Sequence, residues 1–128
     1  MKNKGDTSEF LVISRGKWDA SLPPERIQKA IDEFYVWIEG LIDTGKMKRG
    51  SRLTTEGKTV SKKGIVDGPF GETKEIIGGY WFFIARDLDE AAELAAQNPC
   101  MQCGLSYEIR PLDPERAAAT AVTSETPR

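Results

Sequence analysis

The stretch GGYWFFIAR, residues 78–86, is the strongest β-strand signal in the chain, and the fold class follows from it. In an extended strand Tyr80 and Phe82 point to one side, and Trp81 and Phe83 point to the other. A strand with large apolar side chains on both sides must be covered on both faces. We therefore predict that this segment is a central strand of a sheet.

Two further segments have the pattern of strands. Residues 9–15, EFLVISR, again carry apolar side chains on both sides, and residues 106–112, SYEIRPL, close the regular part of the chain. Between residues 46 and 70, short β-prone pieces are interrupted by glycines, which is typical of hairpins. The sequence thus predicts a sheet with an additional hairpin in its middle.

Two helices are expected. The first has an amphipathic stripe, with Ser21 as the predicted N-cap, Pro23 or Pro24 in the first turn and Gly45 at its end. Its apolar stripe comprises Ile27, Ile31, Phe34, Ile38 and Leu41. The second helix starts with Asp87 as N-cap and Glu90 three residues later, a variant of the capping box, and is expected to run until Pro99.

The order of these elements, β-α-β-β-(β)-α-β, predicts an α+β fold of the ferredoxin-like split βαβ type with an extra hairpin. Two helices can cover only one face of the sheet. We expect a second copy of the chain to cover the other face, which makes the protein a homodimer with a barrel-like body. The predicted domain spans residues 9–112, between a flexible N-terminus (1–8) and a flexible C-terminal tail (113–128).

The amino-acid composition limits the kinds of molecule that the protein is expected to bind. The chain has 128 residues and a formal charge of −2, which argues against general nucleic-acid binding, and no apolar run is long enough for a membrane span. Residues 46–63 carry seven basic residues and one acidic residue, a local charge of +6. This segment either attracts an anionic ligand or is a hairpin that lysines keep soluble. No signal peptide is recognisable, so a cytoplasmic location is expected.

Histidine is absent from the sequence. This absence excludes Ser-His-Asp and Cys-His catalysis and removes the commonest metal ligand. Cys100 and Cys103 form a C-x-x-C pair without further ligands in the chain, although a dimer would bring four thiolates. We expect two loop cysteines that bind no metal, and no cofactor.

Asp67 is the most distinctive carboxylate, because it lies where a β-prone segment runs into Gly68 and Pro69. Two interpretations remain open. Asp67 is either a turn residue without further function, or a charge held at the edge of a cleft by a rigid turn.

The residues around Asp67 carry a resemblance. Asp67-Gly68-Pro69-Phe70, followed by Glu72-Thr73-Lys74-Glu75 and Gly78-Gly79-Tyr80, resembles the signature of the YCII-related family in its DGPF branch. The start and end of the second helix and the closing strand EIRPL fit the same order, so the resemblance covers residues 9–112. It implies a dimeric α+β barrel. For activity it implies less: some relatives are dehydrochlorinases of chlorinated hydroxyquinols, and a His-Asp pair has been suggested as the active centre.

This sequence departs from that pair, because the position of the family's histidine falls near Phe34. If Asp67 is catalytic, as in a small lyase, its proton partner must be another residue, with Lys74, Tyr80, Arg15 and Arg52 as candidates. The function we predict is that of a dimeric module that binds a small ligand in a cleft beside the DGPF loop, and the alternatives are such a lyase and a purely structural or regulatory dimer. The expected ligand-binding residues are Asp67, Gly68, Phe70, Lys74, Tyr80, Trp81, Arg15 and Arg52.

Overall fold

The computed structural model describes residues 6–68 and 76–127. Its elements, in chain order, are β1 (Ser8–Arg15), α1 (Pro24–Asp43), β2 (Met47–Arg52), β3 (Lys58–Ser61), β4 (Gly64–Asp67), β5 (Ile77–Ala85), α2 (Leu88–Ala95), the 3-10 helix η2 (Pro99–Cys103) and β6 (Ser106–Pro111). The class is α+β, as the sequence predicts.

Four strands form one sheet in the order β2-β5-β1-β6, and every neighbouring pair is antiparallel. Consequently β1 and β2, which α1 connects, are parallel with β5 between them. In the same way β5 and β6 are parallel with β1 between them. Val12 lies opposite Trp81 on one side and Ile109 on the other. The two strands with apolar side chains on both sides, β1 and β5, are therefore the two central strands, as their pattern predicts.

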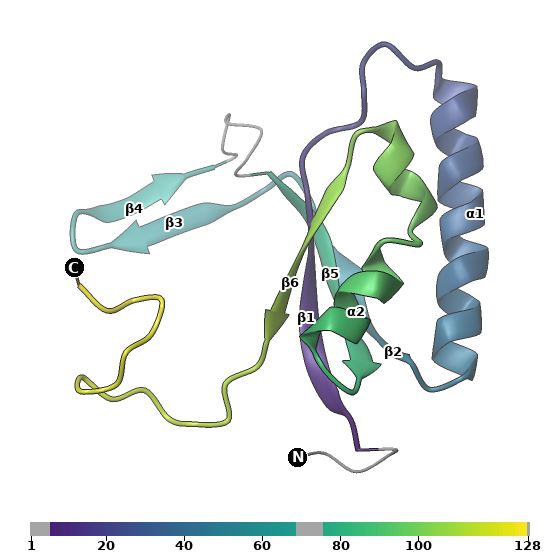
Figure 1. Ribbon diagram of the computed structural model, residues 1–128. Helices are drawn as coiled ribbons and strands as arrows, with labels where there is room; N and C mark the ends of the chain where they lie inside the picture. The colour runs from purple at the N-terminus through teal and green to yellow at the C-terminus, as the bar shows by residue number, and fades with distance from the viewer. Residues whose placement is uncertain (1–5, 69–75, 128) are drawn as a thin grey trace.

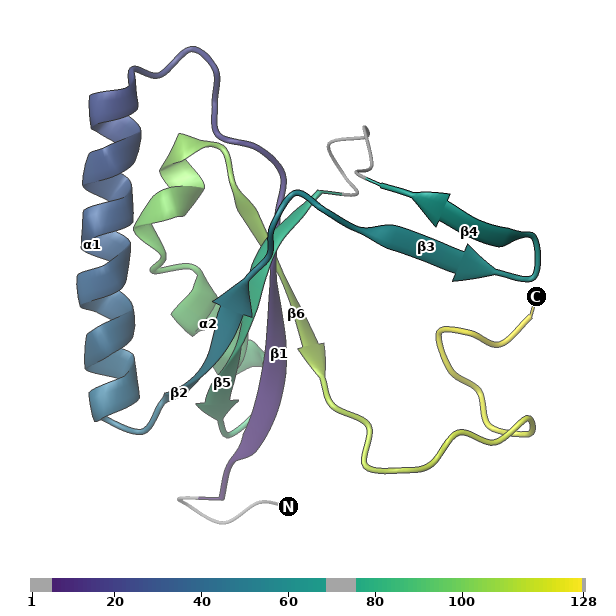
Figure 2. The same cartoon turned by 180° about the vertical axis from the view of Figure 1, so that it is seen from behind.

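The molecule has a helical side and an open side (Figure 1). Helices α1 and α2 lie against one face of the four-stranded sheet, and the β3–β4 hairpin and the C-terminal segment extend away on the other side. The reverse view in Figure 2 shows the same separation. The hairpin is a second, two-stranded sheet in which every residue is exposed.

The core lies between the helices and the sheet. Side chains that alternate along β1 and β5 fill it, because only every second residue of a strand points toward the helices. The buried cluster comprises Phe10, Val12, Ile38, Leu41, Met47, Trp81, Phe83, Ala85, Ala91 and Ala95. The opposite side chains of these strands, including Leu11 and Phe82, are only half-buried.

The first helix ends where predicted but begins differently. Gly45 adopts a φ of +76°, a conformation that suits glycine just past a helix end. At the other end Pro23 is the N-cap and makes no side-chain capping bond. Ser21 was expected there, but its N–H and hydroxyl both donate to the carboxylate of Asp19, which lowers the pKa of Asp19. The helix can begin without a side-chain cap because a proline in its first turn needs no partner for a backbone N–H.

The second helix is shorter than expected. Asp87 caps it as predicted, accepting from the N–H of Glu90 at 2.8 Å, but the helix ends at Ala95 instead of reaching Pro99. The chain then turns, and Asn98 caps the short helix η2 by accepting from the N–H of Cys100. The side chain of Asn98 competes with helical hydrogen bonding at this point, which the alanine-rich composition does not reveal.

No helix within the described residues is long and apolar enough to cross a membrane. The segment after β6 contains no helix or strand in its described part and contacts the sheet through a hydrogen bond from Arg110 to the hydroxyl of Ser124.

Candidate functional site

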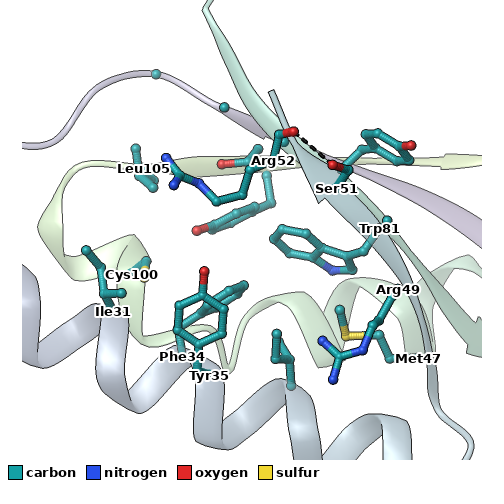
Figure 3. Close-up of a pocket in the computed structure, with 18 of the residues that line it drawn as sticks. Ile31, Phe34, Tyr35, Met47, Arg49, Ser51, Arg52, Trp81, Cys100 and Leu105 are labelled. Atoms are coloured by element: carbon teal, nitrogen blue, oxygen red, sulfur yellow. Dashed lines mark hydrogen bonds between the residues drawn. The ribbon is translucent and has the colours of Figure 1, made fainter. Parts of the chain in front are cut away.

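A cavity of about 710 Å³ lies between α1 and the sheet, at the end where β1 finishes and β5 begins. Side chains of α1, β2, β5 and the segment before β6 form its walls (Figure 3). Its size is within the range of small-molecule binding sites. Most of the lining is apolar or aromatic, including Trp18, Ile31, Phe34, Tyr35, Ile38, Met47, Trp81, Leu105 and Tyr107.

Three glycines lie where the cavity meets the β2–β5 edge. Gly50, Gly78 and Gly79 all line it and place no side chain there. A Cβ atom on Gly50 would lie 2.0 Å from the carbonyl oxygen of Tyr80, and one on Gly79 would lie 2.8 Å from that of Ser51. The two strands approach so closely at this irregular point in their register that only glycine fits.

Trp81 forms the aromatic centre of the site. Its ring lies 5.4 Å from Phe34 and 5.6 Å from Tyr107, measured between centroids, with both pairs tilted. Only 8% of Trp81 is exposed, so these contacts hold the indole in place. Figure 3 shows Trp81 with Arg52 on one side and Arg49 on the other, across the cavity from Phe34 and Tyr35 of α1. A flat apolar ligand would find a preformed aromatic surface here.

A neutral polar group lies in the same cavity. The hydroxyl of Tyr107 is close to Ser14, Asn98 and Cys100, and burial raises the pKa of this phenol well above its usual value. Tyr107 therefore remains a neutral phenol at physiological pH, able to donate or accept a hydrogen bond.

The charged lining is entirely basic. Lys17, Arg49 and Arg52 line the cavity, and no carboxylate is found among the described residues that do so. Arg49 binds Glu39 of α1 at 2.5 Å, so its charge is partly neutralised. The Arg52 guanidinium, in contrast, has no ion-pair partner within residues 6–68 and 76–127.

Three of the predicted ligand-binding residues line this cavity, namely Arg52, Tyr80 and Trp81. They are not equivalent. Tyr80 alternates with Trp81 along β5, and its ring packs against Phe82 at 6.1 Å on the open side of the sheet. Arg52 and Trp81 are thus the two predicted residues whose side chains belong to the helical side or its rim.

The other predicted residues lie elsewhere or outside the described part. Arg15 is at the end of β1, where it binds Glu108 at 2.7 Å and lowers the pKa of that carboxyl. Asp67 ends β4, forms an ion pair with Lys58 across the hairpin, and has a side chain that is 77% exposed. Gly68 donates its N–H to Gly57 at 2.7 Å. None of these lines the cavity.

Phe70 and Lys74 lie outside the described residues.

Sequence reasoning did not identify Arg49, Tyr35 and Tyr107 as site residues. A signal existed for two of them. Tyr35 adjoins the apolar stripe of α1, next to Phe34, and Tyr107 shares one face of β6 with the half-buried Ile109. For Arg49 there was no signal, because several basic residues surround it in the sequence and only the register of β2 selects the one that faces α1.

The cysteine pair belongs to the core. Cys100 and Cys103 are 3% and 0% exposed and pack with Ala30 of α1 in a second buried cluster. Burial, followed by the neighbouring Cys103, raises the pKa of the Cys100 thiol to about 11. Within the part of the chain that the structure describes, no three potential metal ligands of the His, Cys, Asp and Glu types come together.

Comparisons with known proteins place the chain in a family. An uncharacterised protein of Rhizobium meliloti (strain 1021) is 37% identical over 79 residues, which are 56% of this chain and 63% of the relative, just under two thirds of its length. A 5-chloro-2-hydroxyhydroquinone dehydrochlorinase from Burkholderia phenoliruptrix AC1100, solved with 2,5-dihydroxybenzoquinone, aligns over 82% of this chain and 93% of its own, at 17% identity and a TM-score of 0.43. The model of the YCII-related domain matches residues 9–113, from β1 through β6. The chain therefore belongs to the YCII-related family.

Proposed function

We propose that this protein binds a small, largely apolar organic molecule in the cavity between α1 and the sheet. The observation that carries this proposal is the cavity itself: about 710 Å³, walled by Phe34, Tyr35, Trp81 and Tyr107. Sites of this kind combine an apolar wall with a few polar groups that orient the ligand. Here Arg52 and Tyr107 supply such groups.

The site needs no large rearrangement to accept a ligand. Trp81 is held between two aromatic neighbours, and Gly50 and Gly79 let β2 and β5 pack closely along the edge of the cavity. A preformed aromatic pocket loses little conformational entropy on binding, because its side chains are already ordered. This favours binding of a rigid, flat molecule.

A substitution that fills the cavity tests this proposal. Ile31 lines it from α1, so Ile31→Trp should occupy the space meant for the ligand. Val36→Trp on the same helix is the matched control, because Val36 is 76% exposed and does not line the cavity. A set of flat aromatic fragments is screened against all three proteins by ligand-observed NMR.

We expect fragments that bind the parent and Val36→Trp, compete with one another, and lose binding in Ile31→Trp. Fragments that bind Ile31→Trp as well as the parent would contradict the proposal, as would a screen in which no fragment binds the parent. Thermal melts of both variants establish that they are folded.

Asp67 is considered apart from the cavity, because it does not line it. The sequence leaves two roles open for Asp67, a turn residue or a charge at the edge of a cleft. Its exposed position at the base of the hairpin favours the first. A lyase that uses Asp67 stays the alternative hypothesis, and it requires Asp67 to reach a ligand from a position outside the cavity lining. The Asp67-Gly68 pair and the residues that follow it support assignment to the DGPF branch of the family.

We also propose that the protein is a homodimer whose two copies pack their open sheet faces together. Leu11, Ile13, Tyr80, Phe82 and Ile84 form this face, and none of them belongs to the buried core of the single chain. Large apolar surfaces of this kind commonly mark interfaces. A twofold axis would place the same face on both copies, which makes it self-complementary. On this proposal two copies of the sheet enclose a barrel-like interior.

A further inference from the structure

We infer that the ligand of this cavity is an aromatic carboxylate, whose anionic group is bound by Arg52. The inference rests on the proposed function, since it specifies the chemistry of the molecule that the cavity would hold. It starts from the charge of the lining, which includes three basic side chains and, among the described residues, no acidic one. An uncompensated positive charge beside an apolar cavity attracts an anion.

Of the three basic residues, Lys17 and Arg52 form no ion pair in the described chain, and Arg52 is the one whose guanidinium reaches over the cavity in Figure 3. Arg49 is already engaged by Glu39 at 2.5 Å, and this pair ties β2 to α1 at the side of the cavity. Arg52 comes three residues later on the same strand and has no ion-pair partner in the described chain. A guanidinium presents two parallel N–H groups that match the two oxygens of a carboxylate.

The position of Arg52 relative to the aromatic wall sets the shape of the ligand. Figure 3 shows the Arg52 guanidinium reaching over the cavity, with the hydroxyl of Tyr35 directed into the same space and Trp81 beside it. The carboxylate would bind Arg52 at the rim, and the ring would lie deeper, against Trp81 and Phe34. The Tyr35 hydroxyl is a second donor for the carboxylate.

This arrangement distinguishes a carboxylate from a neutral molecule of the same shape. A hydrogen bond to a charged group is stronger than one between neutral groups, so the acid should bind more tightly than its amide. The matched probes are 2-naphthoate and 2-naphthamide, which differ only in the charged group. Their dissociation constants are measured by calorimetry at low salt with the parent protein.

Two variants test whether the charge that binds the carboxylate is that of Arg52. Arg52→Gln removes the guanidinium at the cavity. Arg116→Gln removes the same charge from an exposed position in the C-terminal segment, outside the cavity lining, and controls for the net charge of the protein. Arg52 is exposed and forms no ion pair in the described chain, so Arg52→Gln should fold as the parent does, and a thermal melt checks this.

We expect the parent and Arg116→Gln to bind 2-naphthoate at least about tenfold more tightly than 2-naphthamide. In Arg52→Gln the two probes should bind within about twofold of each other, because only the charge-assisted contact is lost. Tyr35→Phe should weaken 2-naphthoate by a smaller factor than Arg52→Gln.

The outcomes separate this inference from the proposed function. If both probes bind the parent equally well, the cavity binds small molecules but the anion inference is wrong. An equal loss of 2-naphthoate in Arg116→Gln would also overturn it, since the preference would then come from net charge. If neither probe binds, both the inference and the proposed function lose their support.

Discussion

At the scale of single residues, burial changes the chemistry of Cys100 more than its C-x-x-C spacing suggests. The spacing is typical of redox pairs and metal sites, whose cysteines are ionised or easily ionised. Here the surroundings are apolar, the side chain is 3% exposed, and its thiol donates to the carbonyl oxygen of Ala30 at 3.7 Å. A thiol in such a place packs as a small apolar group.

The raised pKa of Cys100 predicts a pH dependence of stability. In the folded protein the pKa of this thiol is about 11, against an ordinary value of 9.0, so the unfolded chain ionises first. The contribution of Cys100 to stability is therefore complete below about pH 9 and is lost as the pH rises toward 11. We expect the melting temperature to fall less steeply over this range in Cys100→Ala than in the parent. Parallel curves for the two proteins would contradict the assignment.

Asp67 provides a second test at this scale. Its ion pair with Lys58 joins two side chains that are 77% and 66% exposed, and such pairs contribute little. We expect Asp67→Asn to change the free energy of unfolding by less than about 1 kcal/mol. Because Asp67 does not line the cavity, the affinity for cavity ligands should stay within about twofold of the parent. A clear loss of affinity would instead favour the alternative in which Asp67 carries a functional charge.

At the scale of elements, the edge between β2 and β5 forms one wall of the cavity. Residues 49 and 50 interrupt the regular pairing of these strands, since the register shifts between Lys48 and Ser51. The backbone of Gly50 comes so close to Tyr80 that the strands leave no room for a side chain. An irregularity of this kind redirects the neighbouring side chains. On either side of this irregularity, Arg49 binds Glu39 of α1 and Arg52 lies at the rim of the cavity.

Gly50→Ala tests this close approach. The added Cβ atom would lie 2.0 Å from the Tyr80 carbonyl oxygen, so the strands must move apart, and we expect a loss of about 1–3 kcal/mol in the free energy of unfolding. Gly40→Ala is the control, because it lies in α1 with no atom within 4 Å of the new Cβ, and it should be neutral or stabilising by up to about 1 kcal/mol. Urea denaturation of both variants gives the two values. Equal stabilities would show that the β2–β5 edge adapts freely.

At the scale of the whole molecule, the two sides of the sheet are unequal. The helices bury one side, while the open side is only half-buried and carries charges around its apolar centre. Lys48 binds Glu9 at 2.9 Å and lies 4.8 Å from the ring centroid of Phe82, and Arg15 and Arg110 both bind Glu108. An apolar centre with a charged rim is the composition expected of an interface between proteins.

A charge in the centre of this face tests the proposed dimer. Phe82→Glu would bury a carboxylate between two sheets, so we expect a folded monomer where the parent is a dimer, measured by light scattering at micromolar concentration. Val36→Glu, on the outer side of α1 and 76% exposed, should remain a dimer. A parent protein that is monomeric under these conditions would refute the proposal.

The sequence by itself determined the order of the two α-helices and the strands of the main sheet, and which two strands are central. Alternation of apolar residues along β1 and β5 is a local property, because every second side chain of a strand shares a face. The cap at Asp87 and the end of α1 at Gly45 are likewise local, since each depends on one residue and its immediate neighbours.

Only the tertiary structure decided which residues meet at the cavity. Arg52, Trp81 and Tyr107 come from three different strands, and their convergence depends on the strand order and on the shifted register beside Gly50. The same holds for Asp67, whose turn residues are evident in the sequence. The direction of the hairpin, which carries Asp67 away from the helical side, depends on contacts between distant parts of the chain that local spacing does not contain.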